Sequence, residues 1–196
     1  MKRGRERIGI LGGTFDPPHV GHLIIAEQAC AQVRLDKLLF IPAYLPPHKR
    51  SGGRANPRQR LTMVRLATTG RPKFEASSIE ITRKGISYTV DTLRELQKMH
   101  RGAMFYLIVG GDNFDSFKSW KSVDEISRLA TIVVYKRRSP KKRTTGTRMA
   151  KLVHLRGALI DISSTMIRDR VKKGESIRFL VPERVRRFID KNKLYI

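Results

Sequence analysis

Two histidines with two residues between them, His19 and His22, stand directly before the stretch Leu23–Ala29, which reads as a helix. The glycine-rich segment in front of them follows the apolar run Ile8–Leu11, so a turn between a strand and a helix is predicted. At such a turn the backbone can approach an anion closely, and the first amides of the helix favour negative charge. The pattern indicates phosphate chemistry, with both imidazoles as hydrogen-bond donors.

The spacing excludes two common phosphate loops. A Walker loop needs Gly-x-x-x-x-Gly-Lys-Ser/Thr, which does not occur, and Gly9, Gly12 and Gly13 have the wrong intervals for the dinucleotide fingerprint. A metal site or a satisfied polar turn formed by Asp16, His19 and His22 is the alternative. A metal would need a further Cys, His or carboxylate, and none lies within the next few positions.

A second candidate phosphate segment, Ile162–Arg168, lies near the other end of the chain. Ser163 or Ser164 is expected to cap the helix that follows, leaving N–H groups and hydroxyls facing outward. Arg168 falls about one turn into that helix, where its planar set of donors suits phosphate oxygens. Alone, Ser-Ser-Thr is most often only a cap, so its weight comes from the histidine segment upstream.

The elements that must position these residues alternate between strand and helix. Strands are predicted at Ile8–Gly12, Leu38–Ile41, Phe105–Val109 and Thr131–Tyr135, with extended structure at Phe74–Ile81, onward to Ser87, and at Leu152–Leu155 and Ala158–Asp161. Helices are predicted at 21–34, from Pro57 behind an Asn56 cap, at Val90–Met99 behind a Thr89 cap, from a Ser122 capping box to about Ala130, and from Pro182 to about Lys191. The loop 43–56 is expected to be irregular and 136–148 disordered.

This alternation predicts an α/β fold: a Rossmann-like, doubly wound parallel sheet with helices on both faces and a small C-terminal helical extension. We expect residues 1–196 to form one domain, with about 160–196 as the helical part that carries the second phosphate segment. In such sheets ligands bind beyond the carboxyl ends of the strands, where Gly12, Pro42, Gly110 and Lys136 fall.

Composition limits the remaining classes of protein. No apolar run approaches a membrane span and residues 1–7 lack the apolar core of a signal peptide, so a cytoplasmic protein is expected. The single cysteine, Cys30, is expected to be a small core residue. The net charge of +24 exceeds what one nucleotide site needs. It predicts at most weak, non-specific attraction of nucleic acid, because no aromatic-interleaved basic patch accompanies it.

Five segments together carry a resemblance to a known family. His-x-Gly-His and Ile162–Arg168 are similar to the motifs of the nucleotidyltransferase superfamily. Phe40–Lys49, Ile86–Leu93, and Val109–Asp112 with Ser119-Trp120 extend the similarity to the bacterial nicotinate-nucleotide adenylyltransferases, over about Ile8 to Tyr195. The resemblance implies a reaction that joins nicotinate mononucleotide to the AMP part of ATP. Pyrophosphate and deamido-NAD are the products, Mg²⁺ accompanies the ATP, and no protein-held metal site is expected.

The resemblance and the residue chemistry together assign a candidate site. The catalytic candidates are His19, His22 and Arg168. ATP is assigned to Gly12, Gly13, Thr14, Phe15, Gly110, Asp112, Ser163, Ser164 and Thr165. The mononucleotide is assigned to Asp16, His48, Lys49, Tyr88, Thr89 and Trp120, with the Tyr88–Thr89 amides receiving the nicotinate carboxylate and the Trp120 ring stacking on the pyridine. Asp112 would contact an adenosine ribose hydroxyl or serve the metal.

Three alternatives stay open from the sequence. The family often has an aromatic residue or histidine directly after this tryptophan, whereas this chain has Lys121. A preference for nicotinamide mononucleotide, or for both mononucleotides, therefore competes with the nicotinate reading. Adenylylation of phosphopantetheine is disfavoured by the Ser-Tyr-Thr-x-Asp-Thr segment. A basic polyanion-binding protein on the same fold is the alternative of a different class.

Overall fold

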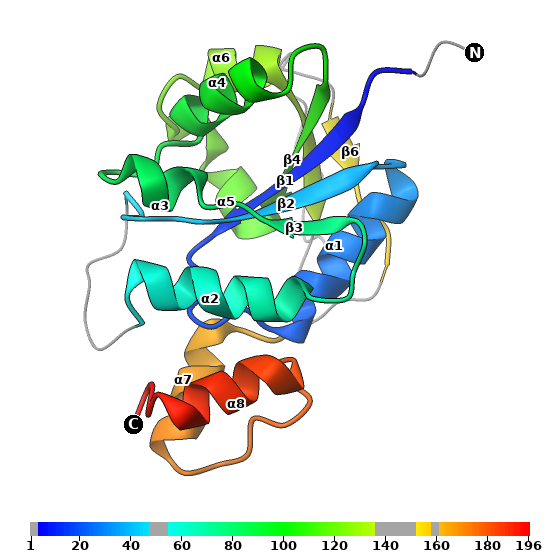
Figure 1. Cartoon of the computed structure of the whole chain (residues 1–196). Helices are drawn as coiled ribbons and strands as arrows, with labels where there is room; N and C mark the ends of the chain where they lie inside the picture. The colour runs from blue at the N-terminus through cyan, green and yellow to red at the C-terminus, as the bar shows by residue number, and fades with distance from the viewer. Residues whose placement is uncertain (1–3, 48–54, 136–151, 158–160) are drawn as a thin grey trace.

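Six parallel strands form one open sheet in the computed structural model, which describes residues 4–47, 55–135, 152–157 and 161–196 (Figure 1). The strand order is β3-β2-β1-β4-β5-β6, and every neighbouring pair is parallel. The bounds are β1 (Arg7–Gly13), β2 (Lys37–Pro42), β3 (Phe74–Ala76), β4 (Met104–Gly110), β5 (Ala130–Tyr135) and β6 (Leu152–His154). The predicted doubly wound parallel sheet is confirmed.

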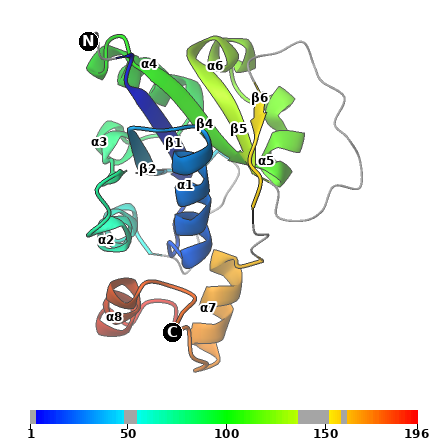
Figure 2. The ribbon, with the colours of Figure 1, turned by 90° about the vertical axis from the view of Figure 1, so that its right-hand side faces the viewer.

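Helices cover both faces of this sheet. They are α1 (Val20–Gln32), α2 (Pro57–Thr68), α3 (Ile79–Arg83), α4 (Thr89–Met99), α5 (Gly111–Asp115), α6 (Val123–Leu129), α7 (Ser164–Lys172) and α8 (Glu183–Lys191), with a 3-10 turn, η1, at Phe117–Ser119. Side chains of α1, α2 and α8 share one hydrophobic cluster with the sheet, and those of α3, α4 and α6 share the other. Figure 2 shows α7 and α8 below α1 and α2 as a separate tier.

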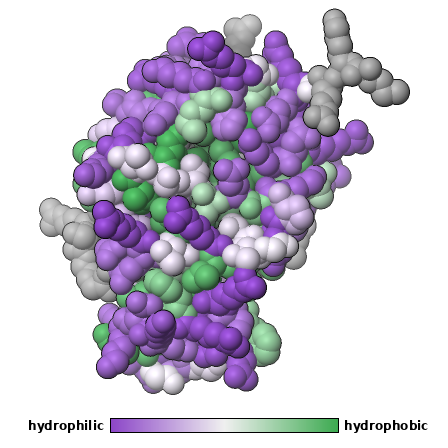
Figure 3. Space-filling view, viewed as in Figure 1, coloured by the Kyte–Doolittle hydropathy of each residue, from purple (hydrophilic) through white to green (hydrophobic). Residues whose placement is uncertain are grey.

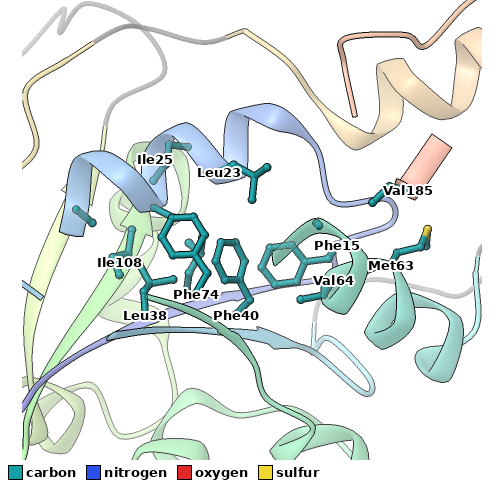
Figure 4. Close-up of a cluster of buried hydrophobic side chains, with 14 of the residues drawn as sticks. Phe15, Leu23, Ile25, Leu38, Phe40, Met63, Val64, Phe74, Ile108 and Val185 are labelled. Carbon is teal, nitrogen blue, oxygen red and sulfur yellow. The ribbon is translucent and has the colours of Figure 1, made fainter. Parts of the chain in front are cut away.

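Alternation along the central strands builds the two layers of core. In β1, Ile8 and Ile10 pack toward α4, while Leu11 packs toward α1. Because both faces are covered, the strands read as continuous apolar runs rather than as alternating polar and apolar residues. Figure 4 shows the α1–α2 layer, where Phe40 lies between Phe15 and Phe74. Cys30 is buried in this layer as expected, and burial raises the pKa of its thiol to about 11.

Three local predictions were wrong. The chain is extended only to Ala76, and α3 follows, because a helical turn lets the neighbours Ile79 and Glu80 both be buried, which a strand would not. Thr89 is the first residue of α4 and Tyr88 is its N-cap, with no side-chain cap hydrogen bond. Ser122 precedes α6 but has a left-handed backbone and no side-chain cap.

Other local predictions are confirmed or fall outside the described ranges. Asn56 caps α2 by accepting from the Gln59 amide at 2.9 Å, and Ser163 caps α7. The helix α5 and the turn η1 were not predicted, since two glycines at the end of a strand disfavour a helix. The loop expected at 136–148 and most of the extended segment expected at 158–161 lie outside the residues that the structure describes.

In the face shown in Figure 3, hydrophilic residues cover most of the outline and smaller hydrophobic areas lie toward the middle. Within the described ranges, no helix is both long enough and apolar enough to cross a bilayer.

The strand order creates the kind of position at which ligands bind in open α/β folds, namely the carboxyl ends of two central strands. The chain crosses from one side of β1 to the other between β3 and β4, so β1 and β4 flank the point where the order reverses. The carboxyl ends of these strands are Gly13 and Gly110. The first phosphate segment follows one of them and α5 follows the other.

Candidate active site

The loop from β1 to α1 is held by a side chain that points down into the core. Phe15 is 2% exposed, and its backbone has a positive φ of 51°. Its ring packs edge-on to His22, with centroids 4.9 Å apart. A Cβ on Gly13 would lie 3.2 Å from the Phe15 ring, so glycine lets the loop fold over its own anchor. The loop that carries the histidines is therefore fixed from below.

The two imidazoles lie side by side at the start of α1. Their ring centroids are 3.7 Å apart; His19 is 3% exposed and His22 is half-buried. The backbone N–H of His19 donates to Nδ1 of His22 at 3.2 Å. Because Nδ1 accepts, a neutral His22 carries its proton on Nε2. His22 thus has its N–H donor on the far side of the ring from the backbone.

The N-terminus of α1 offers fewer amides than the sequence suggests. The Val20 N–H donates to the Leu180 carbonyl at 3.0 Å, and the His22 N–H donates to the His19 carbonyl at 3.0 Å. Both amides are already used, the first by the segment before α8 and the second within the turn itself. Neither amide is therefore available to a phosphate.

Helix α7 brings the second phosphate segment onto the first. The Ser164 hydroxyl donates to the Pro17 carbonyl at 2.8 Å, and Arg168 Nη1 donates to the Asp16 carbonyl at 2.8 Å. Arg168 Nη2 also donates to the Thr165 hydroxyl at 3.2 Å. The predicted meeting of the two segments is thus present. The Ser164 hydroxyl, however, donates its hydrogen bond to the loop between β1 and α1 instead of facing outward.

Asp16 is an anchor at the centre of this junction. It is 1% exposed, and its Oδ1 accepts from the Ala55 amide at 3.2 Å and from the Tyr195 hydroxyl at 2.7 Å. Its Oδ2 is buried and has no hydrogen-bond partner among the described residues. The carboxylate therefore joins the loop, the start of α2 and the segment after α8. Its assignment to the mononucleotide stays a prediction.

Replacing Tyr195 with phenylalanine is expected to lower the free energy of unfolding by about 2 kcal/mol at pH 7, because a hydrogen bond to the buried carboxylate is lost. Burial and Asp16 raise the pKa of Tyr195 above its ordinary value. The unfolded chain, with a tyrosine pKa of about 10, releases this proton at a lower pH than the folded protein does. This contribution to stability is therefore full below pH ~10 and is lost as pH rises further.

Urea unfolding from pH 7 to pH 11 checks both parts. The difference between wild type and Tyr195→Phe should shrink by about 1.4 kcal/mol for each pH unit above ~10. Tyr44→Phe is the matched control, since the described residues give its hydroxyl no hydrogen bond. A difference that stays constant across this range would mean that Tyr195 ionises as it does in the unfolded chain.

Arg60 links the phosphate loop to the segment after β2. It is 4% exposed, and its guanidinium donates to the carbonyls of Thr14 at 2.8 Å, Tyr44 at 3.1 Å and Ala55 at 3.3 Å. Burial lowers the pKa of Arg60, while Asp16 opposes this shift. A guanidinium still stays charged, so Arg60 is a buried cation that ties three stretches of backbone together.

The segment that begins α4 is held from two sides. The Ser87 hydroxyl accepts from the Tyr44 amide at 2.9 Å, and the Ser87 N–H donates to the Leu45 carbonyl at 2.9 Å. Behind it, the Thr92 hydroxyl donates to the buried Glu80 at 2.6 Å, and burial raises the pKa of this carboxyl. Tyr88 and Thr89 are thereby set beside the segment after β2, which Arg60 connects to the phosphate loop.

The remaining predicted site residues make fewer contacts with the two candidate phosphate segments. Trp120 is half-buried and packs on Phe117, with centroids 5.2 Å apart. Gly110 ends β4 where a Cβ would lie 3.1 Å from the Tyr135 hydroxyl, and Asp112 is exposed in the first turn of α5. Gly12 and Gly13 are the last two residues of β1, and Thr14 begins the loop that follows. His48 and Lys49 lie outside the described residues.

Sequence reasoning missed Arg60, Tyr195 and Glu80. For Arg60 a signal existed, because it lies on the same side of α2 as the buried Val64 and Ala67, and a charge within an apolar stripe must find buried partners. No local sequence pattern indicates the roles of Tyr195 and Glu80. The partner of Tyr195, Asp16, is far away in sequence. Glu80 lies on α3, which was not predicted, and its partner Thr92 lies on α4.

The donor set does not form a metal cage by itself. Among the described residues, no group of three or more His, Cys, Asp or Glu side chains could hold a metal ion.

Comparison with known proteins agrees with this geometry. The cytidylyltransferase-like family model matches residues 10–170. A protein named "Probable nicotinate-nucleotide adenylyltransferase" from Geobacillus thermodenitrificans is 41% identical over 96% of this chain and 86% of its own length. One of the same name from Shouchella clausii is 38% identical over 97% of each chain.

Solved structures show the same fold. Nicotinic acid mononucleotide adenylyltransferase of Plasmodium falciparum, in its complex with NaAD, superposes with a TM-score of 0.78 at 17% identity, covering 97% of this chain and 98% of that one. At that identity the likeness speaks for the fold only. The near full-length relatives decide the family: the chain belongs to the nicotinate-nucleotide adenylyltransferases, within the cytidylyltransferase-like proteins.

Proposed function

We propose that this protein transfers the adenylyl group of ATP to nicotinate mononucleotide, forming deamido-NAD and pyrophosphate. A 5′-phosphate oxygen of the mononucleotide attacks the α-phosphorus of ATP in line, and the bond to the pyrophosphate oxygen breaks. The nucleophile is already an anion, so no serine, cysteine or strong base is needed. Catalysis then consists of positioning two polyanions and neutralising charge in the transition state.

The observation that carries the proposal is the junction of the two phosphate segments. Arg168 reaches the Asp16 carbonyl at 2.8 Å, and the Ser164 hydroxyl reaches that of Pro17 at 2.8 Å. We infer that His22, through Nε2–H, and the remaining N–H groups of the Arg168 guanidinium stabilise the charge that develops on the phosphoryl oxygens. His19 supports His22 and adds a second donor. The amides of Gly12–Phe15 and of Ser163–Thr165 would hold the ATP phosphates.

We assign the mononucleotide to the region where the segment after β2 meets the start of α4. We propose that the amides at the start of α4 receive the nicotinate carboxylate, that Trp120 stacks on the pyridine ring, and that His48 and Lys49 contact the mononucleotide. The family acts on ATP together with a divalent cation, for which we propose Mg²⁺. Asp112 would serve this ion or contact a ribose hydroxyl. The cytoplasm, where ATP is available, is the compartment we propose.

Pyrophosphate release tests this function. With ATP and Mg²⁺, we expect turnover with nicotinate mononucleotide to exceed turnover with nicotinamide mononucleotide at equal concentrations. Identification of deamido-NAD by mass spectrometry completes the assay. Equal or amide-favouring turnover would contradict the acid preference, and no pyrophosphate with either acceptor would contradict the function as a whole.

A further inference from the structure

Lys121 lies against the first turn of α4 from a different part of the chain. It follows Trp120 directly, and its Nζ is 4.2 Å from the centroid of the Tyr88 ring and 3.4 Å from Asp91 Oδ2. The side chain is 49% exposed, so its ammonium is reachable from solvent. The Lys121 ammonium is therefore held at the N-terminus of α4, beside its N-cap residue Tyr88.

The ammonium offsets a negative charge at the same place. Asp91 lies in the first turn of α4 and also pairs with Arg94 at 3.0 Å, while Arg94 is shared with Glu125 at 2.6 Å. Two cations thus face two carboxylates in this cluster of Asp91, Arg94, Lys121 and Glu125. Without Lys121 the cluster would be net negative and would repel an acidic group bound at the start of α4.

Hydrogen bonding alone distinguishes an acid from an amide weakly at this position. Within the described residues, the backbone N–H groups of Thr89 and Val90 donate no hydrogen bond. They are suitable donors for a carboxylate oxygen and also for an amide oxygen, since both accept. The sign of the local charge is what separates the two ligands.

We propose that Lys121 is a specificity-determining residue that favours nicotinate over nicotinamide mononucleotide by keeping the start of α4 from being net negative. The inference rests on the proposed function, since it takes the Thr89 and Val90 amides at the start of α4 as the carboxylate site; the Tyr88 N–H itself donates to the Ile86 carbonyl at 3.1 Å.

Charge arithmetic gives an ordered prediction for the ratio of kcat/KM with the acid to kcat/KM with the amide. Lys121→Met removes one positive charge, Asp91→Asn removes one negative charge, and the double variant restores the balance. The ratio should therefore be highest in Asp91→Asn, about equal in wild type and the double variant, and lowest in Lys121→Met. We expect a roughly fivefold fall in Lys121→Met, the size of one partly exposed charge interaction.

The experiment measures this ratio by pyrophosphate release, and in parallel titrates each mononucleotide without ATP by calorimetry. Lys118→Met is the matched control, because Lys118 lies on η1 and makes no ion pair in the described ranges. Lys121→Arg should keep the wild-type ratio. A purely structural role for Lys121 would lower turnover of both mononucleotides alike, and the double variant would be worse than either single variant.

Each outcome decides the inference. A fall in the ratio that Asp91→Asn reverses supports it. A ratio in Lys121→Met within twofold of wild type, or an equal change in Lys118→Met, overturns it. If wild type releases no pyrophosphate, the proposed function fails, and the calorimetric preference of wild type against Lys121→Met then decides the role of Lys121 independently.

Discussion

Replacing His22 with alanine is expected to lower kcat for adenylyl transfer by about 10²–10³, with a smaller change in KM for either nucleotide. The Nδ1 atom of His22 accepts from the His19 N–H, so the proton on Nε2 is the donor offered to the phosphoryl group. A donor aimed at charge that develops only in the transition state affects the rate more than ground-state binding. Steady-state kinetics with both substrates, supported by single-turnover rates, measure the split.

Two further variants separate catalysis from folding. His154→Ala removes an exposed histidine on β6 and should leave kcat unchanged. In His22→Asn, the amide oxygen of asparagine can still accept from the His19 N–H, but the variant lacks the distal N–H of the imidazole. We expect His22→Asn to be more thermally stable than His22→Ala and to have an equally low kcat. Full activity in His22→Asn would remove His22 from the catalytic group.

Replacing Arg60 with leucine is expected to destabilise the protein by about 3–5 kcal/mol, because three buried carbonyls lose their donor at about 1–3 kcal/mol each and the loops relax only in part. It should also lower kcat/KM by about 10², since Thr14 and Tyr44 belong to the two halves of the site that Arg60 ties together. Urea unfolding and initial rates at a temperature where the variant is folded measure the two effects.

Arg58→Leu is the matched control for this prediction, because Arg58 lies on the same helix with its side chain exposed. Arg60→Lys should recover little, since one ammonium cannot reach carbonyls that a planar guanidinium spans. If the unfolding midpoints of Arg60→Leu and Arg58→Leu coincide, the buried hydrogen bonds of Arg60 do not stabilise the fold.

The fold was predictable from the sequence because its elements follow local rules. The apolar runs of β1, β2, β4 and β5 are continuous since both faces of the sheet are covered, and glycine or proline ends three of them. Local spacing also selected the two candidate phosphate segments, which contact each other in the structure, while their binding of phosphate stays a prediction. The failure at Ile79–Arg83 has the opposite cause: Ile79 and Ile81 alternate as a strand would, but contacts with α4 favour a helix.

For the candidate site, the sequence could predict which residues belong to it but not which of their atoms are accessible. Accessibility depends on partners distant in sequence, so Asp16 could be predicted as a site residue but its burial and its hydrogen bond from Tyr195 could not. The same holds for the Val20 amide, which the Leu180 carbonyl covers. Short motifs specify the groups that chemistry needs, whereas tertiary packing decides which of their atoms remain available.

The contacts that close the site also bear on how the protein folds. Ser164 to Pro17, Arg168 to Asp16 and Tyr195 to Asp16 join residues 147, 152 and 179 positions apart. Contacts of such separation carry the loop-closure entropy of the intervening chain, so we expect them to form after the pairing of β1 with β2 and β4. A refolding chain would therefore regain its secondary structure before its affinity for nucleotides. Conditions that loosen the α7–α8 tier would make the enzyme inactive while its sheet is still intact.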